Sequence, residues 1–169
     1  ETTGLAVKQG HRVIEIGCLE IQHRRLSGGK FHHYLNPDRD SDPGALAVHG
    51  LTRDFLSDKP HFADIVTPLL DFLRGAELLI HNADFDVGFL DAELARAGHK
   101  EKLADLCTIT DPVLMARKKH PGQKNNLNAL CDRDLVDNPQ PEFNGAPQAE
   151  GRPAGAQQRR APGQSQVAP

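Results

Sequence analysis

A polar group directly follows a short apolar run at residues 77–80, and it consists of His81, Asn82, Asp84 and Asp86. An apolar pattern with helical spacing resumes just after it, so the group lies where a strand is expected to pass into a helix. In α/β proteins functional groups gather at such junctions, and carboxylates there can hold divalent cations. The alternative is helix capping, in which Asp84 or Asp86 accepts backbone N–H groups. The residues of this stretch alone leave both interpretations open.

Other polar clusters have ordinary structural explanations. His32-His33 lie next to each other in an expected strand and point to opposite faces, so they cannot both chelate one metal ion. Arg24-Arg25 and Arg117-Lys118-Lys119 are small basic clusters. A solvated surface is the default for such clusters, and contact with a DNA backbone is the alternative.

The elements that must position these residues follow a recognisable order. An expected β-hairpin has strands at residues 12–21 and 31–35, with a glycine turn at 26–30 between them. Short strands are expected at 77–80 and 103–108, and helices at 62–73, 87–97, 111–119 and 127–131. Pro68 should kink or shorten the first of these helices. Hairpin strands followed by alternating strands and helices predict an α/β fold, with a mixed sheet flanked by helices.

Composition narrows the class of protein. The 169 residues carry a formal net charge of −3, which argues against a protein that binds DNA through non-specific phosphate contacts alone. Three scattered cysteines and the lack of a long apolar run or signal peptide predict a reduced, cytoplasmic protein without a membrane span. Residues 139–169 are rich in Pro, Gln, Ala and Gly, so this tail is expected to be disordered.

Four short segments together resemble a known family. They are E-T-T-G at 1–4, V-I-E-I-G at 13–17, D-P…V-H-G at 42–50 and H-N-A-D-F-D at 81–86. Their order and spacing resemble the DEDDh 3′–5′ exonucleases, in particular the proofreading epsilon subunits of bacterial DNA polymerase III. The resemblance runs from Glu1 to about Asn138, so an exonuclease-like domain is expected at 1–138, incomplete at both ends.

The resemblance implies an RNase H-like fold that removes nucleotides from a DNA 3′ end with two divalent metal ions, Mg²⁺ or Mn²⁺. Two such ions can activate water and stabilise the leaving oxygen of a phosphodiester. In this family Glu1 and Asp86 match catalytic metal ligands. The aspartate expected two positions before Glu1 would precede the first residue of this chain. By family, the partners are a single-stranded or frayed DNA 3′ end and the polymerase III alpha subunit with its core assembly.

Further positions match substrate-binding residues of the family. They are Thr2, Thr3, His49, His81, Asn82 and Phe85. Asp84 is an extra carboxylate at a variable position, where surface or capping roles are expected.

The last motif of the family departs from its pattern here. The histidine that serves as general base falls on Asn144, and the following metal-ligand aspartate falls on Ala149. An asparagine amide cannot take a proton from water at neutral pH, and an alanine methyl cannot bind metal. We therefore expect impaired catalysis, and a lost reading frame near Pro139 is one hypothesis for the change. An exonuclease that trims RNA and a catalytically inactive binding or scaffold domain remain the alternatives.

Overall fold

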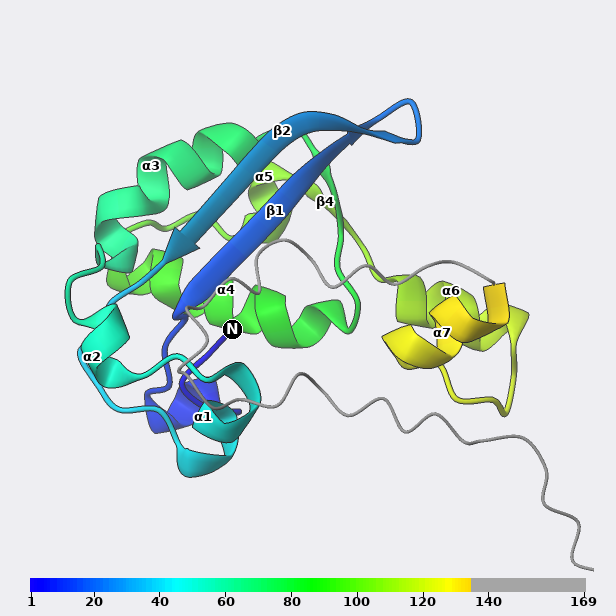
Figure 1. The fold of residues 1–169 in the computed structure, drawn as a ribbon. Coiled ribbons are helices and arrows are strands. Elements are labelled where there is room, and N and C mark those ends of the chain that lie inside the picture. Colours follow the sequence, from blue (N-terminus) through cyan, green and yellow to red (C-terminus); the bar gives the residue numbers. More distant parts are fainter. Residues whose placement is uncertain (135–169) are drawn as a thin grey trace, which may run out of the picture.

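The computed structural model describes residues 1–134, and its most prominent feature is a long antiparallel hairpin of β1 (Glu15–Gln22) and β2 (Arg25–Tyr34) (Figure 1). Glu15 pairs with Tyr34 at one end, and Gln22 pairs with Arg25 at the other. One face of the hairpin is buried through side chains such as Ile16 and Phe31. The expected hairpin is confirmed.

The turn of the hairpin lies at a different place from the one predicted. His23 and Arg24 have φ values of 51° and 66°, the left-handed conformation that a two-residue type I′ turn requires at both positions. Gly28 and Gly29 lie inside β2, where the register between Leu19 and Ile21 is irregular. The glycine-turn prediction is therefore wrong.

The two glycines instead form a bulge opposite Glu20. Gly28 has φ 94°, a conformation that L side chains rarely adopt. A Cβ on Gly29 would lie 2.6 Å from Glu20 Oε2, whose carboxylate accepts a hydrogen bond from Ser27 Oγ. The glycines thus permit extra residues in β2 and the close approach of the Glu20 side chain.

A second, parallel pair of strands consists of β3 (Glu77–Leu79) and β4 (Thr108–Thr110). The prediction of a strand at 103–108 is wrong. Residues 103–106 form the short helix α5 (Leu103–Leu106), and the strand begins only at Thr108. The Asp105 carboxylate accepts the Lys102 N–H at 2.8 Å, which favours a helical turn there. The strands in residues 1–134 thus form one antiparallel and one parallel sheet, and the α/β class is confirmed.

The first residues of the chain lie beside the segment that leads into β1. Thr2 forms an antiparallel bridge with Val13, and the Ile14 N–H donates to the Glu1 carbonyl at 2.9 Å. A short 3₁₀ helix, η1 (Val7–Gln9), and Gly10 then turn the chain back. Glu1 is thereby fixed at the end of the hairpin that lies nearest α1 and α4 (Figure 1).

The remaining helices follow the hairpin along the chain. They are α1 (Pro43–His49), α2 (Arg53–Leu56), α3 (Phe62–Leu73), α4 (Ala83–Arg96), α6 (Pro112–Lys119) and α7 (Leu127–Asp134). Helix α3 has the predicted bounds, and Pro68 lies within it on the exposed side without ending it. Helix α4 starts earlier than predicted, at Ala83, so Asp86 lies in its first turn.

The main core lies between the hairpin and helices α3, α4 and α5. Phe31 of β2 packs against Phe72 of α3 with ring centroids 5.9 Å apart, and Phe89 of α4 is 2% exposed within the same cluster. Helices α6 and α7 lie apart from this core, beyond the end of β4 (Figure 1). None of the helices in the described part of the chain is long and apolar enough to cross a membrane.

A buried ion pair joins α4 to the start of the hairpin. Glu93 is 1% exposed, and its two carboxylate oxygens accept bonds from Arg12 Nε and Nη2 at 2.7 and 2.9 Å. The Val13 N–H donates to Glu93 Oε1 at 3.2 Å, and Arg96 lies 3.3 Å from the same oxygen. The hydrogen bond to Glu93 raises the pKa of Arg12. This arrangement fixes α4 against the segment that pairs with Glu1–Thr3.

We expect Glu93→Ala to lower the free energy of unfolding by about 3 kcal/mol, because Arg12 and the Val13 N–H would be left without their buried acceptor. Denaturant unfolding followed by circular dichroism measures the change. Glu101→Ala removes the same charge from an exposed position and should change stability by no more than about 0.5 kcal/mol. Equal effects of the two substitutions would contradict a structural role for the buried pair.

Candidate active site

A cavity of about 820 Å³ opens where three segments of the chain meet. The first segment is the N-terminal stretch up to Leu5, the second runs from Asp42 into α1, and the third is the first turn of α4. Among the predicted site residues, the cavity is lined by Glu1, Thr2, His49, Phe85 and Asp86. Residues 85 positions apart in the sequence therefore share one cavity.

The carboxylates of Glu1 and Asp86 are close enough to affect each other. Partial desolvation of the Asp86 carboxyl raises its pKa although the residue remains exposed. The terminal ammonium and a backbone hydrogen bond oppose the rise, and the negative charge of Glu1 contributes the smallest part of it. The position of Glu1 follows from its backbone pairing, since its carbonyl accepts N–H groups from both Ile14 and Glu15. A carboxyl that is costly to ionise, with a second carboxyl lining the same cavity, is suited to a cation.

Thr3 lies beneath the cavity rather than on its wall, with no exposed surface. Its hydroxyl is 3.0 Å from His11 Nδ1, and His11 Nε2 is 3.2 Å from Asp42 Oδ2. The Asp42 N–H donates to the Thr3 carbonyl at 2.8 Å. This chain of bonds joins the N-terminal segment to the residue that precedes α1.

Gly4 permits the close approach of this buried histidine. A Cβ at position 4 would lie 2.3 Å from the His11 ring, which is closer than real Cβ contacts. His11 itself is 2% exposed and cannot easily move aside. The glycine of E-T-T-G is therefore explained by packing.

His49 presents one free ring nitrogen among the described residues. Its Nδ1 accepts the Leu51 N–H at 2.9 Å, so the neutral ring carries its hydrogen on Nε2. Nε2 is buried and has no hydrogen-bond partner within residues 1–134. Burial lowers the pKa of His49, which keeps the ring neutral at pH 7. The side chain therefore offers one N–H donor at the cavity that it lines.

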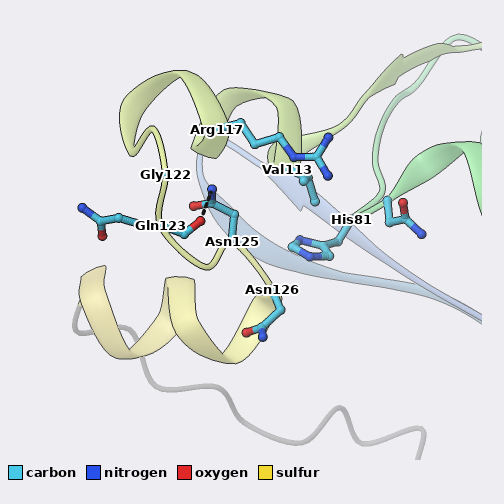
Figure 2. Close-up of a pocket in the computed structure, with 8 residues that line it drawn as sticks. His81, Val113, Arg117, Gly122, Gln123, Asn125 and Asn126 are labelled. Atoms are coloured by element: carbon cyan, nitrogen blue, oxygen red, sulfur yellow. Dashed lines mark hydrogen bonds between the residues drawn. The ribbon is translucent and has the colours of Figure 1, made fainter.

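His81 and Asn82 do not line this cavity. They line a separate, smaller pocket together with residues of α6 and of the loop before α7 (Figure 2). Asn82 has φ 64° and lies at the N-cap of α4, but its side chain makes no capping bond. Asp84 is exposed and lies outside both pockets, as expected for a surface position.

Asp111 fixes the start of α4, although the sequence pattern did not single it out. Its carboxylate accepts the N–H groups of Asn82 and Ala83 at 3.2 Å each and of Val113 at 2.8 Å. Partial burial opposes ionisation, but these three donors outweigh it and lower the pKa of Asp111. Asp-Pro at 111–112 is a helix-start signal, and it could have identified the cap of α6 but not the bond to α4.

Asp42 and His11 were also missed. Asp42 lines the cavity as a third carboxylate, and it is half exposed and paired with His11. No group of three or more His, Cys, Asp or Glu side chains within residues 1–134 has the geometry of a metal site. Mg²⁺ usually keeps several waters and binds one or two carboxylates together with substrate phosphates. Glu1 and Asp86 fit such a partial ligand set for one ion. Asn144, the expected general-base position, lies outside the described residues.

Comparison with known proteins shows which family the chain resembles. A family model described as exonuclease (RNase_T) matches residues 1–141. DNA polymerase III subunit epsilon of Haemophilus influenzae is 48% identical over 150 residues, which are 86% of this chain and 59% of that protein. The Escherichia coli subunit of the same name is 47% identical over 151 residues, or 86% of this chain and 62% of its own length. The chain thus spans less than two thirds of these relatives.

A solved structure has a similar fold. It is exonuclease X in complex with 5′ overhanging duplex DNA, with a TM-score of 0.61 and 26% sequence identity. The match covers 81% of this chain and 70% of that one.

We expect Asp86→Asn to raise the thermal unfolding midpoint of the metal-free protein by a few °C at most. The raised pKa means that the folded state opposes ionisation of Asp86, and an amide removes this penalty. The gain should shrink as the pH falls through the raised folded pKa of Asp86 and should be lost below the unfolded value of about 3.9. Asp84→Asn is the control at the same end of α4 and should give no gain. Lower stability of Asp86→Asn at pH 7 would contradict the expectation.

We expect Asp111→Ala to loosen the start of α4, because it removes the acceptor of three backbone N–H groups. Amide hydrogen exchange at Asn82 and Ala83 should become faster, while exchange in the middle of α3 stays the same. The depressed pKa predicts that acid has the same effect on the wild type: the contribution of Asp111 is present above about pH 4 and is lost as the pH falls through its folded pKa. Unchanged exchange at both residues would show that other contacts hold the helix.

Proposed function

Since the chain belongs to the exonuclease family, whose model matches residues 1–141, we propose that it acts on the 3′ end of a DNA strand as a proofreading subunit of a bacterial DNA polymerase III. The observation that carries the proposal is the convergence of Glu1 and Asp86 in one cavity. Partial desolvation and the nearby charge of Glu1 disfavour the ionised form of Asp86, and a cation between the two carboxylates would offset this. An acidic cavity would otherwise repel a phosphodiester.

Each lining residue has a role in this proposal. Glu1 and Asp86 hold Mg²⁺ or Mn²⁺, which when bound supplies an activated water and charge neutralisation at the phosphate. His49 donates its Nε2 hydrogen to an oxygen of the terminal nucleotide. The Phe85 ring offers an apolar wall to the base.

Thr2 and Thr3 support the terminal nucleotide through the backbone. The Thr2 hydroxyl donates to the Gly4 carbonyl at 2.9 Å, and the Thr3 hydroxyl is near His11 and accepts the Arg12 N–H, so both side chains are engaged inside the protein. Their contribution is therefore the shape of the segment that carries Glu1.

We propose that hydrolysis is slow in this chain. Asn144 and Ala149 stand where the family has its general base and a metal-ligand aspartate. The exonuclease domain would comprise residues 1–138. By its place after the domain, segment 139–169 would take the role of the region through which the family binds the polymerase alpha subunit in the cytoplasm, but it has no apolar anchor for docking. The missing base also favours a second candidate, a domain that binds a DNA end without cleaving it.

A 3′-labelled single strand separates these functions. With Mn²⁺, the wild type should release mononucleotides slowly, Asp86→Ala should release none, and the exposed control Asp84→Ala should equal the wild type. Metal-dependent binding without cleavage would favour the non-catalytic domain. Faster release from a matched RNA strand would favour an RNA-trimming enzyme. If the wild type neither binds nor cleaves the strand, the proposal is overturned.

We expect Asn144→His combined with Ala149→Asp to raise the rate of release by about 10²–10⁴-fold, the usual contribution of a positioned general base. The rate should then depend on pH with a midpoint near that of histidine, about 6.5. The control is Ala149→Asp alone, which restores a carboxylate but no base. No gain over this control would show that Asn144 does not occupy the position of the base.

A further inference from the structure

The smaller pocket has a volume of about 420 Å³ and lies between the start of α4, helix α6 and the loop before α7 (Figure 2). His81 and Asn82 line it from the turn before α4, and Arg117 lines it from α6. Asn125 and Asn126 line it from the loop. The roles proposed above for the catalytic cavity do not use this pocket.

The lining of this pocket is cationic or neutral. No Asp or Glu lines it among the residues of the described chain, in contrast to the catalytic cavity with its three carboxylates. Arg117 is exposed, and within residues 1–134 its guanidinium forms no ion pair. His81 Nδ1 is buried without a hydrogen-bond partner in the same part of the chain. These two groups are suited to an anion.

The loop that completes the pocket is held by its own hydrogen bonds. Asn125 Nδ2 donates to the Gln123 carbonyl at 3.0 Å, and Asn125 Oδ1 accepts from Arg133 at 3.3 Å. Asn126 Oδ1 accepts the Ala129 N–H at 2.8 Å and caps α7. The loop is thus ordered without a ligand, while Arg117 and the Nδ1 atom of His81 have no such partner.

One wall of the pocket, at Asn82, is close to the proposed site of the 3′ end. Asn82 precedes Asp86 by four residues along α4, which is about 6 Å along a helix axis. Successive phosphates of a strand follow each other every few Å, about 3.4 Å of axial rise per nucleotide in a duplex. A strand whose 3′ end lies at Asp86 can therefore place one of its next phosphates at the pocket.

We propose that this pocket binds a backbone phosphate of the substrate strand, about one to three nucleotides inward from the 3′ end. The guanidinium of Arg117 provides the charge, because its planar donor pairs match phosphate oxygens. The ring nitrogen of His81 and the side chain of Asn82 face the same phosphate. This inference rests on the proposed function and adds to it a subsite that favours a strand over a free nucleotide.

Fluorescence anisotropy with the full chain tests the subsite. The probes are a labelled single-stranded DNA octamer with a free 3′ hydroxyl and, as a competitor, thymidine 5′-monophosphate, both with Ca²⁺. Arg117→Ala should weaken octamer binding about 10-fold and leave inhibition by the mononucleotide unchanged. The slope of log K against log salt should fall by about 0.7, because the variant neutralises one phosphate fewer than the wild type.

Two further variants distinguish a specific phosphate contact of Arg117 from non-specific electrostatic attraction. Lys118→Ala removes the same charge from the next, exposed position of α6 and should leave both the octamer affinity and the salt slope nearly unchanged. Arg117→Lys should retain part of the affinity and the full salt slope. Equal thermal midpoints of the variants exclude misfolding.

Four outcomes overturn the inference in distinguishable ways. Equal losses of octamer affinity for Arg117→Ala and Lys118→Ala would show non-specific electrostatic attraction instead of a defined phosphate site. A loss of mononucleotide binding in Arg117→Ala would place Arg117 at the terminal nucleotide instead. If the wild type binds the mononucleotide but its octamer affinity is independent of Arg117, only the subsite fails. If it binds neither probe, the proposed function fails as well.

Discussion

The bidentate bond between Arg12 and Glu93 is the constraint on which the geometry of the site depends. Glu1 is placed by pairing with Val13, Ile14 and Glu15, whereas Asp86 is placed by α4, and the buried pair joins these two parts. Glu93 lies two turns along α4 from Asp86, so a small rotation of the helix there would be transmitted to the cavity. The cost of burying this charge is offset because both oxygens and the neighbouring backbone donor are satisfied.

The site itself disfavours the ionised form of one of its carboxyl groups. Burial and Glu1 both disfavour the ionised form of Asp86, while Asp111 and its three N–H donors fix the helix that carries it. Rigid support allows two carboxylates to remain near each other without relaxing apart. A carboxyl with a raised pKa in a cavity is a pattern common at functional sites.

Local signals predicted much of the fold and the main cavity, and long-range contacts explain the errors. The bounds of α3 followed from its apolar spacing, and the four quoted motifs located Glu1, His49 and Asp86. The turn at His23 was missed because two non-glycine residues adopt the left-handed conformation, which sequence rules assign to glycine. Asp111 was missed because its partners lie 28 and 29 residues away and no spacing rule reveals them.

The bulge opposite Glu20 has a consequence for how the hairpin meets other molecules. Leu19, Ile21 and Leu26 are 46, 56 and 66% exposed near the far end of the hairpin, where apolar strands can associate edge to edge. Extra residues in β2 disrupt the regular spacing of backbone donors and acceptors that a neighbouring strand would need. The glycines of this bulge thus hinder the edge-to-edge association of the exposed apolar end of the hairpin with a second copy of the chain.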